Sequence, residues 1–165
     1  ITGNANAAAV LGHPPVTLSE VTRATAGDGN TITGICVGVE PVTRSSTIYR
    51  EASTERVLRI VTNPDVLYVI QDDGGAALVA DDVGLNAVIN FTHTGSTVTG
   101  LSGCEMEAGT DPPAADASNQ VFIMALAPPE TDPLVAGGNA LGVNAKWIVR
   151  INQQTYRPDA GLGIA

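Results

Sequence analysis

Two short apolar runs, Arg56–Thr62 (RVLRIVT) and Val66–Gln71 (VLYVIQ), dominate the hydrophobic pattern of the chain. The turn Asn63-Pro64-Asp65 separates them, because proline presets φ for a turn while Asn and Asp bond to nearby backbone. Two short runs joined by such a short turn predict an antiparallel β-hairpin. Both alternating faces of each run are largely apolar, so we expect this hairpin to lie centrally, packed on two sides.

The rest of the pattern predicts further short strands separated by turns. Gly27–Asn30 and Asp72–Gly75 are turn signals, and Gly34 and Gly38 predict a bulge or a close backbone approach within their strand. Trp147, Val149 and Ile151 are expected to share one face of the last strand. Six additional strands are predicted, and the third and fourth of them form a hairpin around Gly95-Ser96. They are Val16–Ala24, Thr31–Val39, Ala87–Thr92, Thr97–Leu101, Gln120–Leu126 and Ala145–Asn152.

This spacing predicts an all-β fold, an antiparallel β-barrel or sandwich of roughly eight short strands. We expect a single β-domain over residues 13–152, an extended N-terminal arm over residues 1–12 and a C-terminal tail over residues 153–165. Little helix is expected, apart from a helical turn that Asp81-Asp82 could begin. Pro128–Asn144 is a long Pro/Gly-rich loop, and loops of that length often serve a function.

Composition narrows the class of function. The 165 residues are the size of one domain, and only 15% are charged, against about 25% in a typical soluble protein. This deficit indicates surface that is buried against other subunits. The net charge of −9, with Lys146 as the single lysine, gives no basic stripe for nucleic acid. No apolar run is long enough for a transmembrane helix, so we expect no membrane partner.

The sequence begins at Ile1 rather than Met without a signal-peptide pattern, and we expect a further N-terminal piece in the full protein.

Residues that could carry chemistry are scattered along the chain. Cys36 and Cys104 are expected to be buried free thiols, although spacing alone leaves a disulfide open. His13 and His93 lack a second metal ligand at short spacing.

No catalytic motif is complete. The stretch around Ser102 lacks the second glycine of a nucleophile elbow and is interpreted as turn chemistry. The acidic residues could gather around a cation, but their spacing matches no calcium loop, and solvated turn carboxylates are expected instead. They are Asp72, Asp73, Asp81, Asp82, Glu105 and Glu107. We therefore expect no enzyme activity and no catalytic, cofactor or metal site.

Five segments, which together cover more than half of the chain, carry a family resemblance. They are TITGICVGVEPV (Thr31–Val42), YREASTERVLRIVTNPDVLYVIQDDGG (Tyr49–Gly75), VGLNAVINFTHTGSTVTGLSGCEME (Val83–Glu107), PPAADASNQVFIMAL (Pro112–Leu126) and NAKWIVRIN (Asn144–Asn152). In this order they resemble the small head decoration, or cement, proteins of tailed bacteriophages. That family has no catalytic residues to carry over.

The resemblance implies a structural virion protein on the outer surface of a capsid. Its partners would be the major capsid protein and itself, as a homotrimer, with many weak contacts giving strong collective attachment. Arms that order on docking would place the entropic cost at assembly. Contacts are expected at residues 1–12, 44–50 and 161–165, with these candidates: Ile1, Asn4, Val10, Leu11, Arg44, Tyr49, Arg50, Leu162 and Ile164.

Two other classes of function stay open. A virion surface module that binds a host glycan or another receptor would need exposed aromatic side chains in a groove, and aromatic residues make up only 4% of the chain. A hydrolase would need a cleft that brings His13 or His93 within hydrogen-bond reach of a serine or aspartate.

Overall fold

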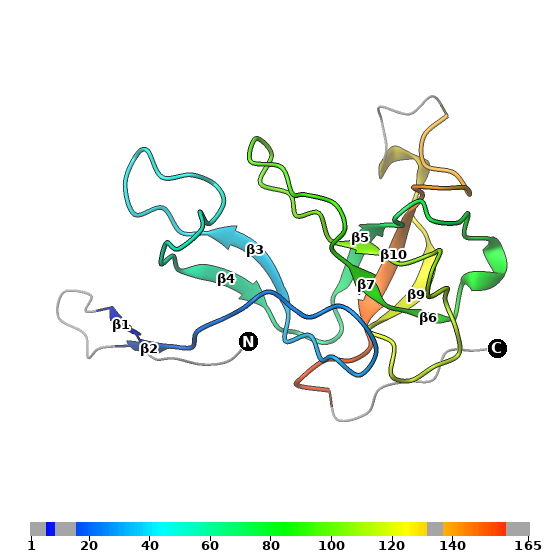
Figure 1. Cartoon of the computed structure of the whole chain (residues 1–165), viewed down its shortest axis with the longest axis horizontal. Coiled ribbons are helices and arrows are strands. Elements are labelled where there is room, and N and C mark those ends of the chain that lie inside the picture. Colours follow the sequence, from blue (N-terminus) through cyan, green and yellow to red (C-terminus); the bar gives the residue numbers. More distant parts are fainter. Residues whose placement is uncertain (1–5, 9–15, 132–136, 158–165) are drawn as a thin grey trace.

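The protein is described by a computed structural model that covers residues 6–8, 16–131 and 137–157. These residues form ten short strands and two 3₁₀ turns (Figure 1). The strands are β1 (Asn6–Ala8), β2 (Val16–Leu18), β3 (Ile35–Val39), β4 (Leu58–Val61), β5 (Leu67–Gln71), β6 (Asn86–Ala87), β7 (Ile89–Asn90), β8 (Glu105–Met106), β9 (Val121–Leu126) and β10 (Lys146–Ile151). The 3₁₀ turns are η1 (Ala80–Asp82) and η2 (Pro129–Thr131).

The predicted all-β class is confirmed, and the strands pair in open antiparallel sheets rather than in a closed barrel. One sheet has four strands in the order β5-β10-β9-β6, and three two-stranded sheets are formed by β1-β2, β3-β4 and β7-β8. Figure 1 shows the β3-β4 sheet displaced along the long axis from the four-stranded sheet. The arrangement is sandwich-like, with ten strands described where roughly eight were expected.

The core lies on one face of the four-stranded sheet. Trp147, Val149 and Ile151 alternate along β10 and are 0%, 2% and 3% exposed, which confirms the face predicted from the sequence. The predicted strand Gln120–Leu126 is also confirmed as β9, whose Ile123 pairs with Val149. The cluster is completed by Ile32, Leu78, Ala87, Ile89, Met106, Ala108, Val121 and Ala145.

The predicted central hairpin is wrong, although its turn is present. The Asn63 side chain accepts a hydrogen bond from the backbone N–H of Asp65 at 2.9 Å. However, β4 pairs with β3 and β5 pairs with β10, so this turn passes the chain from one sheet to another. Nor are both faces packed, since Leu67 and Val69 of β5 are about half exposed.

In the second predicted hairpin, the first strand pairs with a different segment from the one expected. β7 pairs with β8, rather than with Thr97–Leu101, and the turn lies at residues 97–99 rather than at Gly95-Ser96. The two arms approach each other closely, since a Cβ on Gly103 would lie 2.1 Å from the carbonyl oxygen of His93. The arms therefore cross where glycine permits, and the ladder forms beyond that point.

Smaller expectations have mixed outcomes. The register of β3 shifts between Cys36 and Gly38, as the predicted bulge requires, and the helical turn at Asp81-Asp82 is present as η1. The predicted strand Val16–Ala24 is wrong beyond Leu18. The boundaries proposed for the arm, the domain and the tail stay predictions.

Candidate functional site

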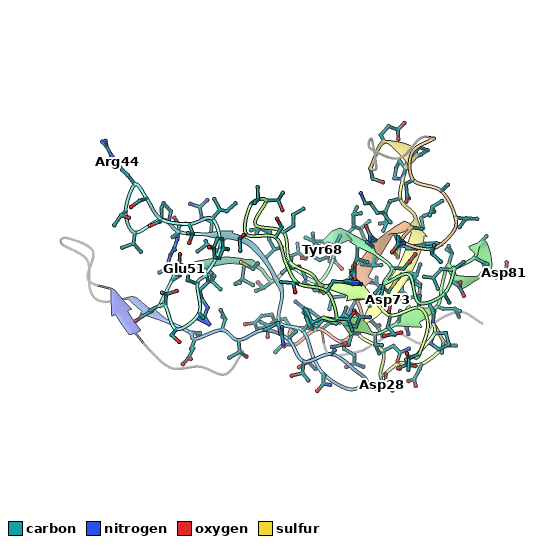
Figure 2. All side chains as sticks on the ribbon, turned by 45° about the horizontal axis from the view of Figure 1, so that its top comes forward. Asp28, Arg44, Glu51, Tyr68, Asp73 and Asp81 are labelled. Atoms are coloured by element: carbon teal, nitrogen blue, oxygen red, sulfur yellow. The ribbon has the colours of Figure 1, made fainter. Side chains whose placement is uncertain are left out.

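Only three of the nine predicted contact residues lie in the described part of the chain. Arg44, Tyr49 and Arg50 all belong to the segment that joins β3 to β4, called here the 40–57 loop. Arg44 is exposed at the tip of this loop and points away from the rest of the protein (Figure 2). The others lie outside the described residues: Ile1, Asn4, Val10, Leu11, Leu162 and Ile164.

Arg56 holds the 40–57 loop closed. Its guanidinium donates to the carbonyl oxygen of Glu40 from Nε and Nη2, at 3.2 and 2.9 Å, and to the carbonyl oxygen of Thr47 at 3.0 Å. The planar fork of arginine suits such multiple bonds. Sequence reasoning missed this role, because Arg56 stands at the start of an apolar run and was assigned to a strand.

Local turns brace the loop from inside. The Ser46 hydroxyl accepts hydrogen bonds from the backbone N–H groups of Val42 and Thr43, at 3.0 and 2.8 Å. Arg50 donates to the carbonyl oxygen of Thr54, whose hydroxyl donates to the carbonyl oxygen of Glu51. Short polar side chains that bond nearby backbone stabilise such turns. The loop is therefore a shaped surface with its own internal bonds.

A second projection, the 91–104 hairpin, packs against this loop. The backbone N–H of Ser96 donates to the carbonyl oxygen of Leu101 at 2.9 Å. Gly100, with φ +73°, lies against the side chain of Ile48, and a Cβ there would lie only 3.1 Å from Ile48 Cδ1. The 40–57 loop and the 91–104 hairpin together are called the loop pair.

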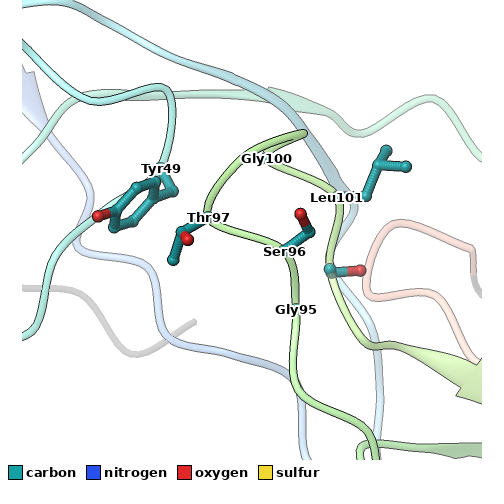
Figure 3. Close-up of a pocket in the computed structure, with 7 residues that line it drawn as sticks. Tyr49, Gly95, Ser96, Thr97, Gly100 and Leu101 are labelled. Atoms are coloured by element: carbon teal, nitrogen blue, oxygen red, sulfur yellow. The ribbon is translucent and has the colours of Figure 1, made fainter.

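A shallow hollow lies between the two members of the loop pair (Figure 3). It has a volume of about 260 Å³, and the ring of Tyr49 forms one side opposite Ser96 and Thr97. Gly95, Gly100, Leu101 and Ser102 complete the lining. The hollow thus combines one aromatic ring with several hydroxyl groups.

The loop pair also exposes large apolar side chains to solvent. Val98 is 86% exposed, Val42 74%, Leu101 71% and Ile48 57%. Large apolar side chains exposed on neighbouring segments are typical of interaction sites when they lie together on the surface. The sequence pattern predicts a strand at Thr97–Leu101, so it did not predict the exposure of Val98 and Leu101.

The acidic residues do not gather into one site. Within the described residues no group of three or more His, Cys, Asp or Glu side chains is placed to hold a metal ion. Asp72 is fully buried, which corrects the expectation of a solvated turn carboxylate. Asp73 and Glu107 both accept from the side-chain amide of Asn90, at 2.8 and 3.0 Å. Burial opposes ionisation of Glu107, but this amide bond and backbone N–H groups lower its pKa.

The hydrolase alternative requires a histidine that is hydrogen-bonded to a serine or aspartate, and His93 has no such bond to any described residue. His93 is paired through Nδ1 with Glu105, and the Ser102 hydroxyl accepts from the backbone N–H of Cys104 at 3.4 Å. His13 lies outside the described residues. Both cysteines are free, and Cys36 is exposed rather than buried, because it lies at the bulge of β3.

The described residues contain no helix with the length and apolar character needed to cross a membrane. Comparison with known proteins gives no match: no protein family model, curated protein or solved structure is significantly similar to this chain.

Proposed function

We propose that this chain is a structural virion protein that binds the outer surface of a bacteriophage capsid and stabilises contacts between neighbouring capsid subunits. The observation that carries the proposal is the exposed apolar surface of the loop pair, formed by Val42, Ile48, Val98 and Leu101. The family resemblance of the sequence and its low charged fraction of 15% support the same function. The partners would be the major capsid protein and further copies of the chain, as a homotrimer.

The geometry suits attachment by surface burial. The loop pair projects from a β-core that is closed around Trp147, so its shape does not depend on the partner. Arg56 and Ser46 fix the backbone of the 40–57 loop, which lowers the ordering cost on binding. Many copies on one shell would then give strong collective attachment from weak single contacts. In this proposal the protein acts by binding, without catalysis.

Cosedimentation with empty shells of the phage that encodes the chain tests the proposal. We expect saturable, stoichiometric binding, and shells with bound protein should withstand higher temperature before they open. The variant Val98→Ser with Leu101→Ser should weaken binding by about tenfold or more, since two exposed apolar anchors are lost. The matched control is Leu141→Ser with Val143→Ser, which removes exposed apolar side chains outside the loop pair. A wild-type protein that stays in the supernatant at all concentrations would contradict the proposal.

A second candidate function is favoured by the hollow beside Tyr49. One aromatic ring with hydroxyl groups around it is chemistry that can bind a sugar ring, and the volume of about 260 Å³ limits it to a small ligand. In this case the chain would be a virion surface module that recognises a host glycan. Saturation-transfer NMR with monosaccharides would show binding that Tyr49→Ala abolishes and Tyr156→Ala, at an exposed tyrosine elsewhere, leaves unchanged.

A further inference from the structure

The outer face of the four-stranded sheet carries an apolar strip that no described residue covers. Leu67 and Val69 of β5 and Met124 of β9 are 51%, 54% and 39% exposed. They lie on the face opposite Trp147, because side chains alternate along each strand. Ile148 of β10 pairs with Val69 and extends the strip across the middle of the sheet.

Two arginines adjoin one end of this strip. Arg150 of β10 pairs with Leu67, and its guanidinium lies over the ring of Phe122 at 5.5 Å. Arg157 reaches Asp65, with Nη2 at 3.8 Å from Oδ1. Asp65 lies two residues before Leu67, so both arginines lie near the start of β5. Burial lowers the pKa of Arg150, and the positive charge of Arg157 lowers it further.

The positive charge of this pair is poorly compensated within the described residues. Asp65 is the one carboxylate paired with it, and its side chain is 80% exposed. Arg150 Nε and Arg157 Nη1 are buried donors that find no acceptor in the described part of the chain. Buried donors are nearly always satisfied in folded proteins, and arginine binds carboxylates well. The pair and the strip therefore form a surface that complements an apolar segment with a carboxylate.

The chain itself exposes such a segment at η1. Val79 and Val83 are 52% and 40% exposed and flank Asp81 and Asp82. Asp82 caps the turn by accepting from the backbone N–H of Val79 at 2.7 Å. Asp81 is exposed and projects from the end of the molecule opposite Arg44 (Figure 2). It forms no hydrogen bond or ion pair with any described residue.

We propose that the outer face of the four-stranded sheet is a docking surface for the η1 segment of a second copy of this chain. Val79 and Val83 of one copy pack on Leu67, Val69 and Ile148 of the next, and Asp81 lies between Arg150 and Arg157. The two patches differ, so the contact is head-to-tail and generates a ring if its rotation closes. This inference deepens the self-association that the proposed function includes, but it uses a surface separate from the loop pair.

Sedimentation velocity of the full chain over a wide concentration range tests the contact. We expect a mass above that of the monomer, with the association midpoint moving to higher concentration as salt is added, because the contact includes a charge pair. Asp81→Arg and Arg150→Glu should each raise the midpoint concentration by about tenfold or more. Combined in one chain, they should recover much of the association, which a merely structural effect would not produce. Asp28→Asn and Arg59→Gln, at exposed charges elsewhere, serve as controls.

Several results would overturn the inference. It is wrong if the wild type stays monomeric at all concentrations, or if the effects of the two reversed charges simply add. Asp159, in the segment outside the described residues, provides a further check. If Asp159→Asn changes the NMR signals of the Arg150 and Arg157 Nε–H groups in the monomer, the chain's own C-terminal segment is the occupant and the inference fails. Shell binding by a monomeric Asp81→Arg variant would leave the proposed capsid function intact, so the two failures are distinguishable.

Discussion

The indole N–H of Trp147 donates to Oδ2 of Asp72 at 3.2 Å inside the core, across 75 residues of sequence. The other carboxylate oxygen accepts from the backbone N–H groups of Gly74 and Asn144, at 3.1 and 2.6 Å. Asp72 thus fastens the turn after β5 and the start of β10 to the largest buried side chain. An acidic residue that resembles a turn carboxylate in the sequence is a structural centre of the fold.

The first prediction concerns Asp72→Asn. The amide nitrogen of the variant would face an N–H donor, so we expect a loss of about 1–3 kcal/mol in the free energy of unfolding at neutral pH. Urea unfolding of both proteins measures this loss. Trp147→Phe, which removes one donor and some volume, should also destabilise the protein. Asp28→Asn, at an exposed carboxylate, should change stability by less than about 0.5 kcal/mol.

The same pair of proteins tests the pH dependence. Burial raises the pKa of Asp72, against the lowering effect of the bonds from Trp147, Asn144 and Gly74. The folded state then binds the proton more tightly than the unfolded state, whose Asp pKa is about 4. The stability of wild type relative to Asp72→Asn should therefore fall as pH rises from about 4 through the raised pKa, and then level off. A relative stability that rises over this range would show that the N–H donors outweigh burial.

A second prediction concerns Gln120, which is fully buried and uses both ends of its amide. Oε1 accepts from the backbone N–H groups of Gly27 and Ile89, and Nε2 donates to the carbonyl oxygens of Thr25 and Asn30. Gln120→Leu keeps the volume but leaves these groups without partners, so we expect a loss of about 3 kcal/mol or more.

Hydrogen exchange and urea unfolding together check this prediction. Amide hydrogen exchange should be faster throughout the Gln120→Leu variant, because its global stability is lower. The increase should be largest over residues 25–30, which Gln120 joins to the core. The matched control is Gln71→Leu, because Gln71 is only partly buried and its side chain forms no hydrogen bond with the described residues. If both variants lose the same stability, the buried amide is not the cause.

The positions of several strands could be predicted from the sequence, whereas the pairing of strands in the sheets could not. The alternation of side chains along the sequence predicted β9 and β10, because one face of each strand is buried against the core and the other is not. The Asn63 turn was also predictable, since its bonds are local. The partners of β4 and β5 were not, because the ladders to β3 and β10 join distant segments that local spacing cannot rank.

The candidate site was predictable to a smaller extent for the same reason. Arg44, Tyr49 and Arg50 do lie on an exposed loop, as polar composition suggested. The loop pair, however, exists because the 91–104 hairpin meets Ile48 at Gly100, a contact between segments far apart in sequence. Nothing in the local pattern distinguishes a glycine that permits such an approach from one that only turns the chain.

Two glycines near the start of the chain provide a third prediction. A Cβ on Gly34 would lie 2.2 Å from the carbonyl oxygen of Val61, whereas one on Gly38 would lie 3.7 Å from its nearest neighbour, Arg59 Cδ. Gly34→Ala should therefore separate β3 from β4 and cost about 2–3 kcal/mol. Gly38→Ala should change stability by less than about 1 kcal/mol, in either direction. Equal thermal midpoints for the two variants would contradict the close approach at Gly34.

The two free cysteines provide the last prediction, on thiol reactivity. Burial, together with the negative charge of Glu105, raises the pKa of Cys104 to about 11, against a smaller opposing effect of Arg23. At pH 8 only about one thiol in a thousand is then ionised at this position, and the thiolate is the reactive form. Cys36 is exposed and donates only a weak bond to the carbonyl oxygen of Gly38 at 3.4 Å.

Iodoacetamide should therefore modify Cys36 of the folded protein first, with Cys104 at least about a hundredfold slower. Peptide mass spectrometry over a time course at pH 8 measures both rates. Cys36→Ser should leave the folded protein almost unlabelled, while in urea Cys104 of this variant should react like an ordinary thiol. Because unfolding removes the burial that raises its pKa, labelling of Cys104 in the folded state then reports opening of the 91–104 hairpin. Equal rates at the two cysteines in the folded wild type would show that this hairpin does not protect the Cys104 thiol.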